Sequence, residues 1–66
     1  MDIGKKLKEL RLQSSLTQEK LASILGISRV NYTRYETGKV RPDYETLLKI
    51  VDYYDIGLDD FFDRAR

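Results

Sequence analysis

Apolar residues recur every three or four positions along almost the whole chain, and glycines and capping residues divide this pattern into five short segments. Such a spacing is typical of one face of an α-helix, whereas a strand alternates at every second residue. No segment keeps a two-residue alternation between turn residues. The pattern therefore predicts an all-α fold of five short helices with short connections.

The predicted helices begin at residues with short polar side chains, which can accept a hydrogen bond from a backbone N–H of the first helical turn. The expected N-caps are Asp2, Thr17, Ser28 and Asp43. The second helix is expected over Gln18–Leu25, and Gly26 can take a positive φ just after it. The third is expected to begin at Arg29 and to end before Gly38, and Gly57 interrupts the chain before the fifth. The apolar positions of the first, second, fourth and fifth helices are Ile3, Leu7 and Leu10; Leu21, Ala22 and Leu25; Leu47, Leu48, Ile50, Val51 and Tyr54; and Leu58, Phe61 and Phe62.

The composition restricts the possible chemistry. A chain of 66 residues is one domain, and this one contains neither cysteine nor histidine. It therefore lacks thiolate and imidazole metal ligands and the commonest general base. It also shows no phosphate-cradling glycine loop, no paired carboxylates, no membrane-spanning apolar run and no signal peptide. We expect no enzyme activity, no cofactor or metal, no small-molecule ligand, no membrane association and a cytoplasmic location.

The net charge of +1 conceals an asymmetry along the chain. Nine basic and four acidic residues precede position 43, a net charge of +5, whereas three basic and seven acidic residues follow from there, a net charge of −4. One half could bind a polyanion while the other half points away from it. Ordinary mixed surface charge is the alternative interpretation.

The third predicted helix separates its residues into two faces. At 100° per residue from Arg29, Thr33 falls at about 40°, Val30 at about 100° and Arg34 at about 140°, on one face. Tyr32 and the other aromatic side chain of this helix fall on the opposite side. Arginine pairs with guanine, threonine donates or accepts, and valine contacts a thymine methyl, so this face suits the major groove of DNA. The alternative is a solvated helix face with two incidental arginines.

The longest motif spans residues 16–62 and reads LTQEKLASILGISRVNYTRYETGKVRP followed by DYETLLKIVDYYDIGLDDFF. The diagnostic elements are TQ at a helix start, LA three residues on, the turn LGIS, YE-x-GK-x-x-P after the third helix, and ETLLKI. In this order and spacing, the chain resembles the Cro and lambda-repressor (XRE-type) helix-turn-helix family from Ile3 to about Phe62. The resemblance implies a single DNA-binding domain over residues 1–66, with the helix-turn-helix unit at about 17–37.

The resemblance also implies roles for individual residues. The base-reading set would be Arg29, Val30, Thr33 and Arg34, and the expected phosphate contacts are Gln18, Asn31, Tyr32, Lys39 and Arg41. A base edge is the alternative contact for Asn31, which lies beside the base-reading face. Gln18 would also help to position the third helix. Tyr32 stands where a smaller aliphatic residue is common, so its hydroxyl needs a partner, and a phosphate is one candidate.

Four further residues are expected to have structural roles. Arg11 and Glu36 would form an ion pair between the first and third helices. Ser15 stands where the family usually has glycine, and since a non-glycine residue at positive φ costs roughly 1 kcal/mol, this turn is expected to be adjusted. Gly57 replaces the usual serine or threonine cap and should weaken the start of the fifth helix.

The last helix holds two adjacent phenylalanines, and one short helix cannot easily bury both in the same core. Phe61 is expected in the core, which leaves Tyr53, Leu58 and Phe62 as candidates for a dimer interface. Packing of Phe62 against the first helix is the alternative.

The function that these features predict is a sequence-specific regulator of transcription, a repressor, that binds double-stranded DNA at an inverted repeat as a homodimer. Its location would be the prokaryotic or phage-type cytoplasm, at the nucleoid. The competing hypothesis is a protein-binding module that has kept the helix-turn-helix fold without specific DNA recognition.

Overall fold

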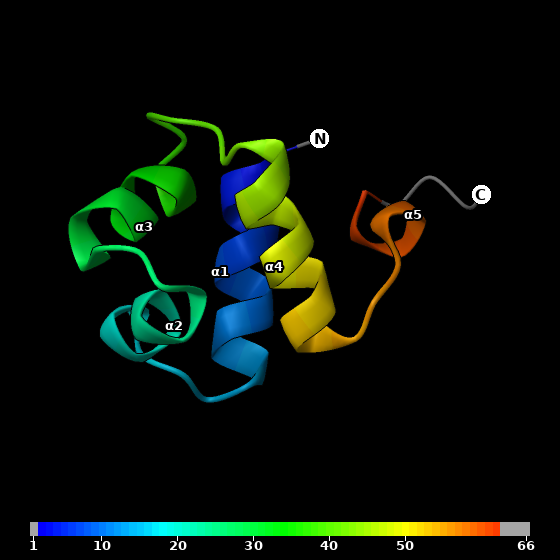
Figure 1. Ribbon diagram of the computed structural model, residues 1–66, viewed down its shortest axis with the longest axis horizontal. Helices are drawn as coiled ribbons and strands as arrows, with labels where there is room; N and C mark the ends of the chain where they lie inside the picture. Colours follow the sequence, from blue (N-terminus) through cyan, green and yellow to red (C-terminus); the bar gives the residue numbers. More distant parts are fainter. Residues whose placement is uncertain (1, 63–66) are drawn as a thin grey trace.

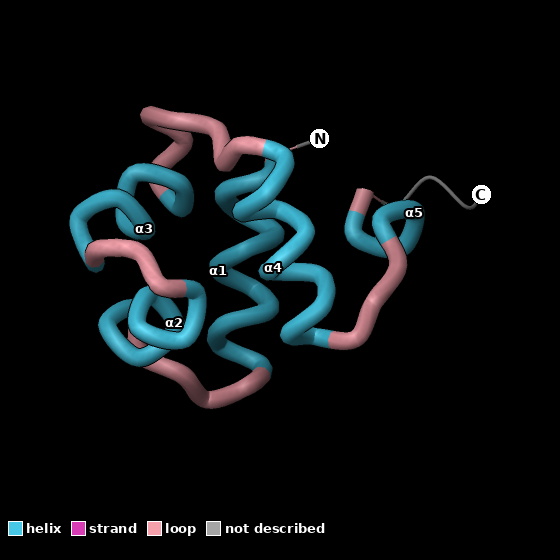
Figure 2. The backbone as a smooth tube through the Cα atoms, viewed as in Figure 1, coloured by secondary structure: helices cyan, strands magenta, loops and turns pink. Residues whose placement is uncertain are grey.

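The computed structural model describes residues 2–62, so Met1 and residues 63–66 of the predicted domain lie outside the described residues. Its five helices are α1 (Ile3–Gln13), α2 (Gln18–Leu25), α3 (Arg29–Glu36), α4 (Tyr44–Tyr54) and α5 (Leu58–Phe61). In Figure 1, α2 and α3 lie together on one side of α1 and α4, and α5 lies on the other side. Short loops join these helices, and no strand occurs within residues 2–62 (Figure 2). The all-α prediction is confirmed.

The four predicted N-caps are confirmed. Each capping side chain accepts a backbone hydrogen bond from the residue three positions later, at distances from 2.8 Å at Asp43 to 3.1 Å at Ser28. Gly57 precedes α5 without a side-chain cap, as expected. These contacts lie within four residues of sequence, which explains why the sequence alone predicts where the helices begin.

Left-handed backbone follows each of the first four helices, at Ser15, Gly26, Gly38 and Asp55. Gly26 (φ 73°) ends α2, and its N–H reaches back to the carbonyls of the last turn. Ser15 has φ 59°, so the turn keeps the left-handed conformation with a non-glycine residue, and the expected adjustment is not seen. In the turn after α4, Asp55 (φ 53°), two residues before Gly57, takes the left-handed conformation. An Asp tolerates this region because its short polar side chain can hydrogen-bond locally.

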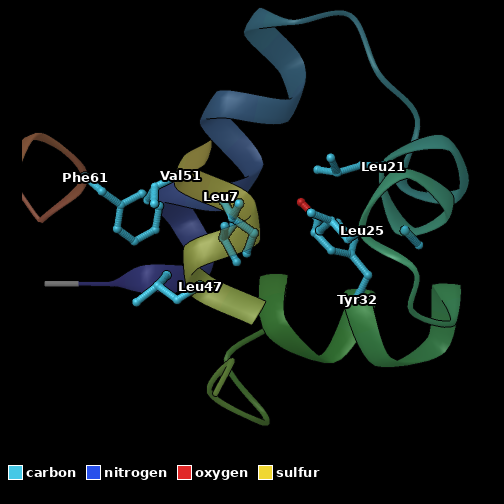
Figure 3. Packing of buried hydrophobic residues seen from close by; sticks show 9 residues of the cluster. Leu7, Leu21, Leu25, Tyr32, Leu47, Val51 and Phe61 are labelled. Carbon is cyan, nitrogen blue, oxygen red and sulfur yellow. The ribbon is translucent and has the colours of Figure 1, made fainter. Parts of the chain in front are cut away.

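All five helices contribute to one hydrophobic core. Its buried residues are Leu7, Leu21, Ala22, Leu25, Tyr32, Leu47, Ile50, Val51 and Phe61. In Figure 3, Leu7 lies in the middle, with Val51 and Phe61 on one side and Leu25 and Tyr32 on the other. The fully buried Phe61 confirms the predicted core position and anchors the short α5, which has only four residues.

Helix α1 approaches the end of α3 very closely at Gly4. A Cβ atom on Gly4 would lie 2.5 Å from the carbonyl oxygen of Glu36 and 2.6 Å from that of Tyr35. Contacts under 3.0 Å are not tolerated without a shift of the backbone. The absence of a side chain at position 4 therefore sets the distance between α1 and α3.

Candidate nucleic-acid interface

Three of the four predicted base-reading side chains, those of Arg29, Val30 and Arg34, are exposed, and Val30 is 62% exposed despite being apolar. The fourth, Thr33, is half-buried. All four line one open hollow of about 350 Å³ on the outer side of α3. We call this hollow the α3 surface. The full set of lining residues is Arg29, Val30, Thr33, Arg34, Thr37 and Lys39.

The α3 surface is strongly cationic, because three of its six lining residues are basic and none is acidic. Lys39 reaches it from the loop after α3, as expected for a side chain that contacts a phosphate. Thr37 is the member that sequence reasoning missed. It lies four residues after Thr33 and therefore on the same helix face, a signal that was available in the sequence.

The other predicted phosphate contacts lie at different places. Asn31 is exposed on α3, but it does not line the hollow. Gln18 and Arg29 border a second hollow at the start of α2. Arg41 is exposed and lines a third hollow, beside Ile3 and Gly4 at the start of α1. The structure thus brings the base-reading set together with Lys39, and it does not place Arg41 in the same hollow.

The Gln18 side chain, in the first turn of α2, forms hydrogen bonds with two residues of α3. Its Nε2 donates to Glu36 Oε1 at 3.0 Å, and its Oε1 accepts from Thr33 Oγ1 at 3.1 Å. These two bonds join α2 to α3, which is the contact that the expected positioning role requires. Since a side-chain amide nitrogen carries two protons, the second remains for another acceptor such as a phosphate.

The predicted ion pair between Arg11 and Glu36 is confirmed. Arg11 Nε and Nη2 donate to the two carboxylate oxygens at 2.7 and 3.3 Å, and Nη1 donates to the carbonyl of Leu16 at 2.9 Å. The side chains are only 12% and 4% exposed. Burial by itself would raise the pKa of Glu36, but the hydrogen bonds that the carboxylate accepts outweigh burial and lower that pKa below its ordinary value.

The proposed phosphate contact of Tyr32 is wrong. Tyr32 is fully buried in the core, so its hydroxyl cannot reach DNA. The hydroxyl lies close to the Glu36 carboxylate, but within residues 2–62 no partner meets the geometry of a hydrogen bond to it. Burial is the main reason that the pKa of Tyr32 lies far above its ordinary value. The error arose because the hydroxyl was assigned an external partner, although the helix geometry already placed Tyr32 on the inward face.

The three candidates for a dimer interface differ in exposure. Tyr53 is 44% exposed on α4 and stacks edge-on against Tyr54. Leu58 and Phe62 are half-buried and pack against the core. The Phe62 ring meets the Phe61 ring edge-on, with centroids 5.1 Å apart. Phe62 also borders the hollow at Ile3 and Gly4, at the start of α1.

Two negative observations apply to residues 2–62. Within this range no group of three or more carboxylates is placed to hold a metal ion. None of the five helices there has the length and apolar character that crossing a membrane requires.

These observations define a class of protein. Helices α2 and α3 are joined by the short turn 26–28, and α3 presents a cationic face outward, which is the arrangement of a helix-turn-helix domain. The chain belongs to the helix-turn-helix family, whose model matches residues 7–61. The predicted family membership is therefore confirmed.

Relatives of this chain are named as regulators of transcription. It is 49% identical over 53 residues to the uncharacterized HTH-type transcriptional regulator YqaE of Bacillus subtilis, covering 80% of this chain and 46% of YqaE. It is 36% identical over 64 residues to the cryptic phage CTXphi transcriptional repressor RstR of Vibrio cholerae, covering 97% of this chain and 57% of RstR. The chain thus spans about half the length of these relatives. Their names agree with the expectation that it is not an enzyme.

A solved structure shares the fold. The crystal structure of a transcriptional regulator from Listeria innocua matches with a TM-score of 0.83 over 89% of this chain and 55% of that one. The sequence identity is 22%, so this likeness shows the fold and extends the comparison no further.

Proposed function

We propose that this chain is a sequence-specific double-stranded DNA-binding domain of a transcriptional regulator, a repressor, that reads the major groove with α3. The observation that carries the proposal is the α3 surface, where three cations and no acid surround exposed Val30 and half-buried Thr33. Cations attract the phosphates, and the mixture of donors with an apolar group suits base edges. Membership in the helix-turn-helix family and the name of the repressor RstR support it. Such a regulator would act in the cytoplasm, at the nucleoid.

A homodimer on an inverted repeat is the second part of the proposal. One helix-turn-helix unit reads only a few base pairs, so this architecture gains specificity by binding two half-sites about one helical turn apart. The exposed Tyr53 ring is the best candidate for the subunit contact, and half-buried Leu58 is a second candidate. The acidic residues that follow position 43 suit a surface that points away from DNA.

Selection from a random double-stranded DNA library at near-physiological salt tests the proposal. We expect an enriched inverted repeat with half-sites about 10 base pairs apart. A single enriched half-site would support DNA reading and contradict dimerisation of the isolated chain. The absence of enrichment would contradict specific recognition and favour the competing protein-binding module. Binding whose affinity falls steeply with salt distinguishes the DNA-binding domain from that module.

Substitutions of Arg34 and Lys39 separate base reading from phosphate binding. We expect Arg34→Ala to weaken binding to the selected site by about 1–3 kcal/mol and to relax the preference at one or two base positions. Lys39→Ala should weaken binding to all sequences alike and reduce the slope of affinity against salt. Titration of a site library at several salt concentrations measures both effects. Lys49 is exposed on α4, outside the α3 surface, so Lys49→Ala is the matched control and should change neither quantity. A uniform loss of affinity in both variants would refute the assignment of Arg34 to the bases.

A further inference from the structure

The ion pair at Glu36 determines which end of the Gln18 amide faces α3. Glu36 is charged because the Arg11 guanidinium, which only donates, is bound to both of its oxygens. A charged carboxylate accepts hydrogen bonds and donates none. Gln18 must therefore turn its nitrogen toward Glu36, at 3.0 Å, and its carbonyl oxygen toward Thr33. The orientation of this amide is thus dictated from the inside of the molecule.

The same chain of bonds determines where the Thr33 proton lies. The Thr33 hydroxyl donates to Gln18 Oε1 at 3.1 Å. A hydroxyl has one proton and two lone pairs, so the proton is used and the rest of the oxygen can only accept. Thr33 is half-buried and lines the α3 surface beside Arg29 and Arg34. A polar group that approaches Thr33 from the outside therefore meets an acceptor and a methyl group.

We propose that Thr33 is a specificity-determining residue, an inference that rests on the proposed function. Its hydroxyl accepts a hydrogen bond from an exocyclic amino group and so selects adenine or cytosine at the base it faces. Adenine N6 and cytosine N4 are the amino groups displayed in the major groove. Guanine O6 and thymine O4 are acceptors there, so their lone pairs would face those of the Thr33 oxygen without a proton between them. Arg29 and Arg34 only donate and favour guanine. Thr33 therefore adds the opposite preference to the same surface.

Glu36 and Gln18 act as positioning residues in this scheme, because they touch Thr33 or its partner rather than the base. Arg11 keeps Glu36 charged, Glu36 orients Gln18, and Gln18 takes the proton of Thr33. A charge buried between α1 and α3 thereby sets the hydrogen-bonding character of one atom on the α3 surface.

The experiment is selection from the random DNA library with the wild type, Thr33→Val and Thr33→Ser. Valine matches threonine in shape and lacks the hydroxyl, whereas serine keeps the hydroxyl and lacks the methyl. The position that changes in Thr33→Val identifies the base that Thr33 faces. We expect adenine or cytosine there in the wild type, and Thr33→Val should lose about twofold to tenfold of that preference. Thr33→Ser should keep it, and the other positions should not change.

Thr37→Val is the matched control. Thr37 is a second threonine of the α3 surface, and its hydroxyl proton is donated to the backbone carbonyls of Thr33 and Arg34. We expect it to leave the preference at the Thr33 position unchanged. A change at that position in Thr37→Val would overturn the assignment to Thr33.

Glu36→Gln tests the positioning part separately. A glutamine at position 36 can accept as well as donate, so Gln18 can turn over and Thr33 can donate outward. In Glu36→Gln we expect the preference for adenine or cytosine over guanine or thymine to be nearly lost. Combining Glu36→Gln with Thr33→Val should cause no further change. Selection at a temperature where circular dichroism shows both proteins folded keeps this comparison valid. An unchanged preference in folded Glu36→Gln would overturn the role of Glu36.

The remaining outcomes are decisive as well. Guanine or thymine at the Thr33-dependent base would overturn the inference and leave the proposed function standing. So would a preference that survives in Thr33→Val and disappears in Thr33→Ser, because the methyl group would then read the base. A wild type that enriches no sequence would refute the proposed function itself, before any variant is compared.

Discussion

Arg11→Ala is expected to lower the free energy of unfolding by about 3–5 kcal/mol, because it leaves the Glu36 carboxylate charged, 4% exposed and without its cation. It also removes the bond from Nη1 to the Leu16 carbonyl, which holds the loop between α1 and α2. For a domain of this size the melting temperature should fall by more than about 12 °C. Urea and thermal unfolding, followed by circular dichroism at pH 7, measure the loss.

Two variants serve as controls for this prediction, one at position 11 itself and one elsewhere on α1. Arg11→Lys keeps the charge but loses the two-pronged contact, so its stability should lie between those of the wild type and Arg11→Ala. Lys8→Ala removes an exposed cation from α1 and should change stability by less than about 0.5 kcal/mol. A loss in Arg11→Ala as small as that of Lys8→Ala would show that the ion pair contributes little to folding.

The effect of Arg11→Ala should also depend on pH. In the wild type the pKa of Glu36 is lowered below 4.5, so its contribution to stability is present above about pH 4.5 and is lost as the pH falls through the folded-state pKa. In the variant, burial without the cation raises the pKa of Glu36. The carboxylate therefore becomes protonated at a higher pH, which removes the cost of burying an unpaired charge. The difference between the two proteins should therefore shrink on acidification. A difference that stays constant from pH 7 to pH 3 would contradict this account.

Gly4→Ala is expected to destabilise the domain by about 1–3 kcal/mol or more, although alanine is the better helix former. The added Cβ would lie 2.5 Å from one backbone carbonyl oxygen and 2.6 Å from another, both on α3. Backbone atoms cannot rotate out of the way as a flexible side chain can, so α1 and α3 must move apart. That movement would also disturb the Arg11–Glu36 ion pair, which joins the same two helices.

Gly57→Ala is the matched control for Gly4→Ala. A Cβ there would lie 3.9 Å from the side-chain oxygen of Asp60, an ordinary distance, and the backbone is not left-handed. We expect a change of less than about 1 kcal/mol, because the weaker cap and the stiffer unfolded chain oppose each other. Thermal unfolding of the two variants side by side tests the comparison. Equal melting temperatures would show that α1 can shift at no cost.

The features that were predicted correctly from the sequence are those set by contacts between residues about four positions apart or fewer. A cap such as Ser28 bonds the N–H three positions later, and apolar spacing marks the inward face of each helix. The outward face of α3 follows from 100° per residue, so Arg29 and Arg34 could be placed together without coordinates. The ion pair between Arg11 and Glu36, 25 residues apart, was predicted only through the resemblance to a family.

Contacts among α1, α2 and α3 became known only from the tertiary structure. The sequence did not reveal that Gly4 lies against the carbonyls of α3, or that the Tyr32 hydroxyl is buried beside Glu36. It also did not reveal that Gln18 bonds Glu36 and Thr33 at once. Local periodicity determines which way a side chain points, and it does not determine which distant atom it meets. Those distances are set by how α1, α2 and α3 pack, and they control which hydrogen-bonding groups remain for DNA.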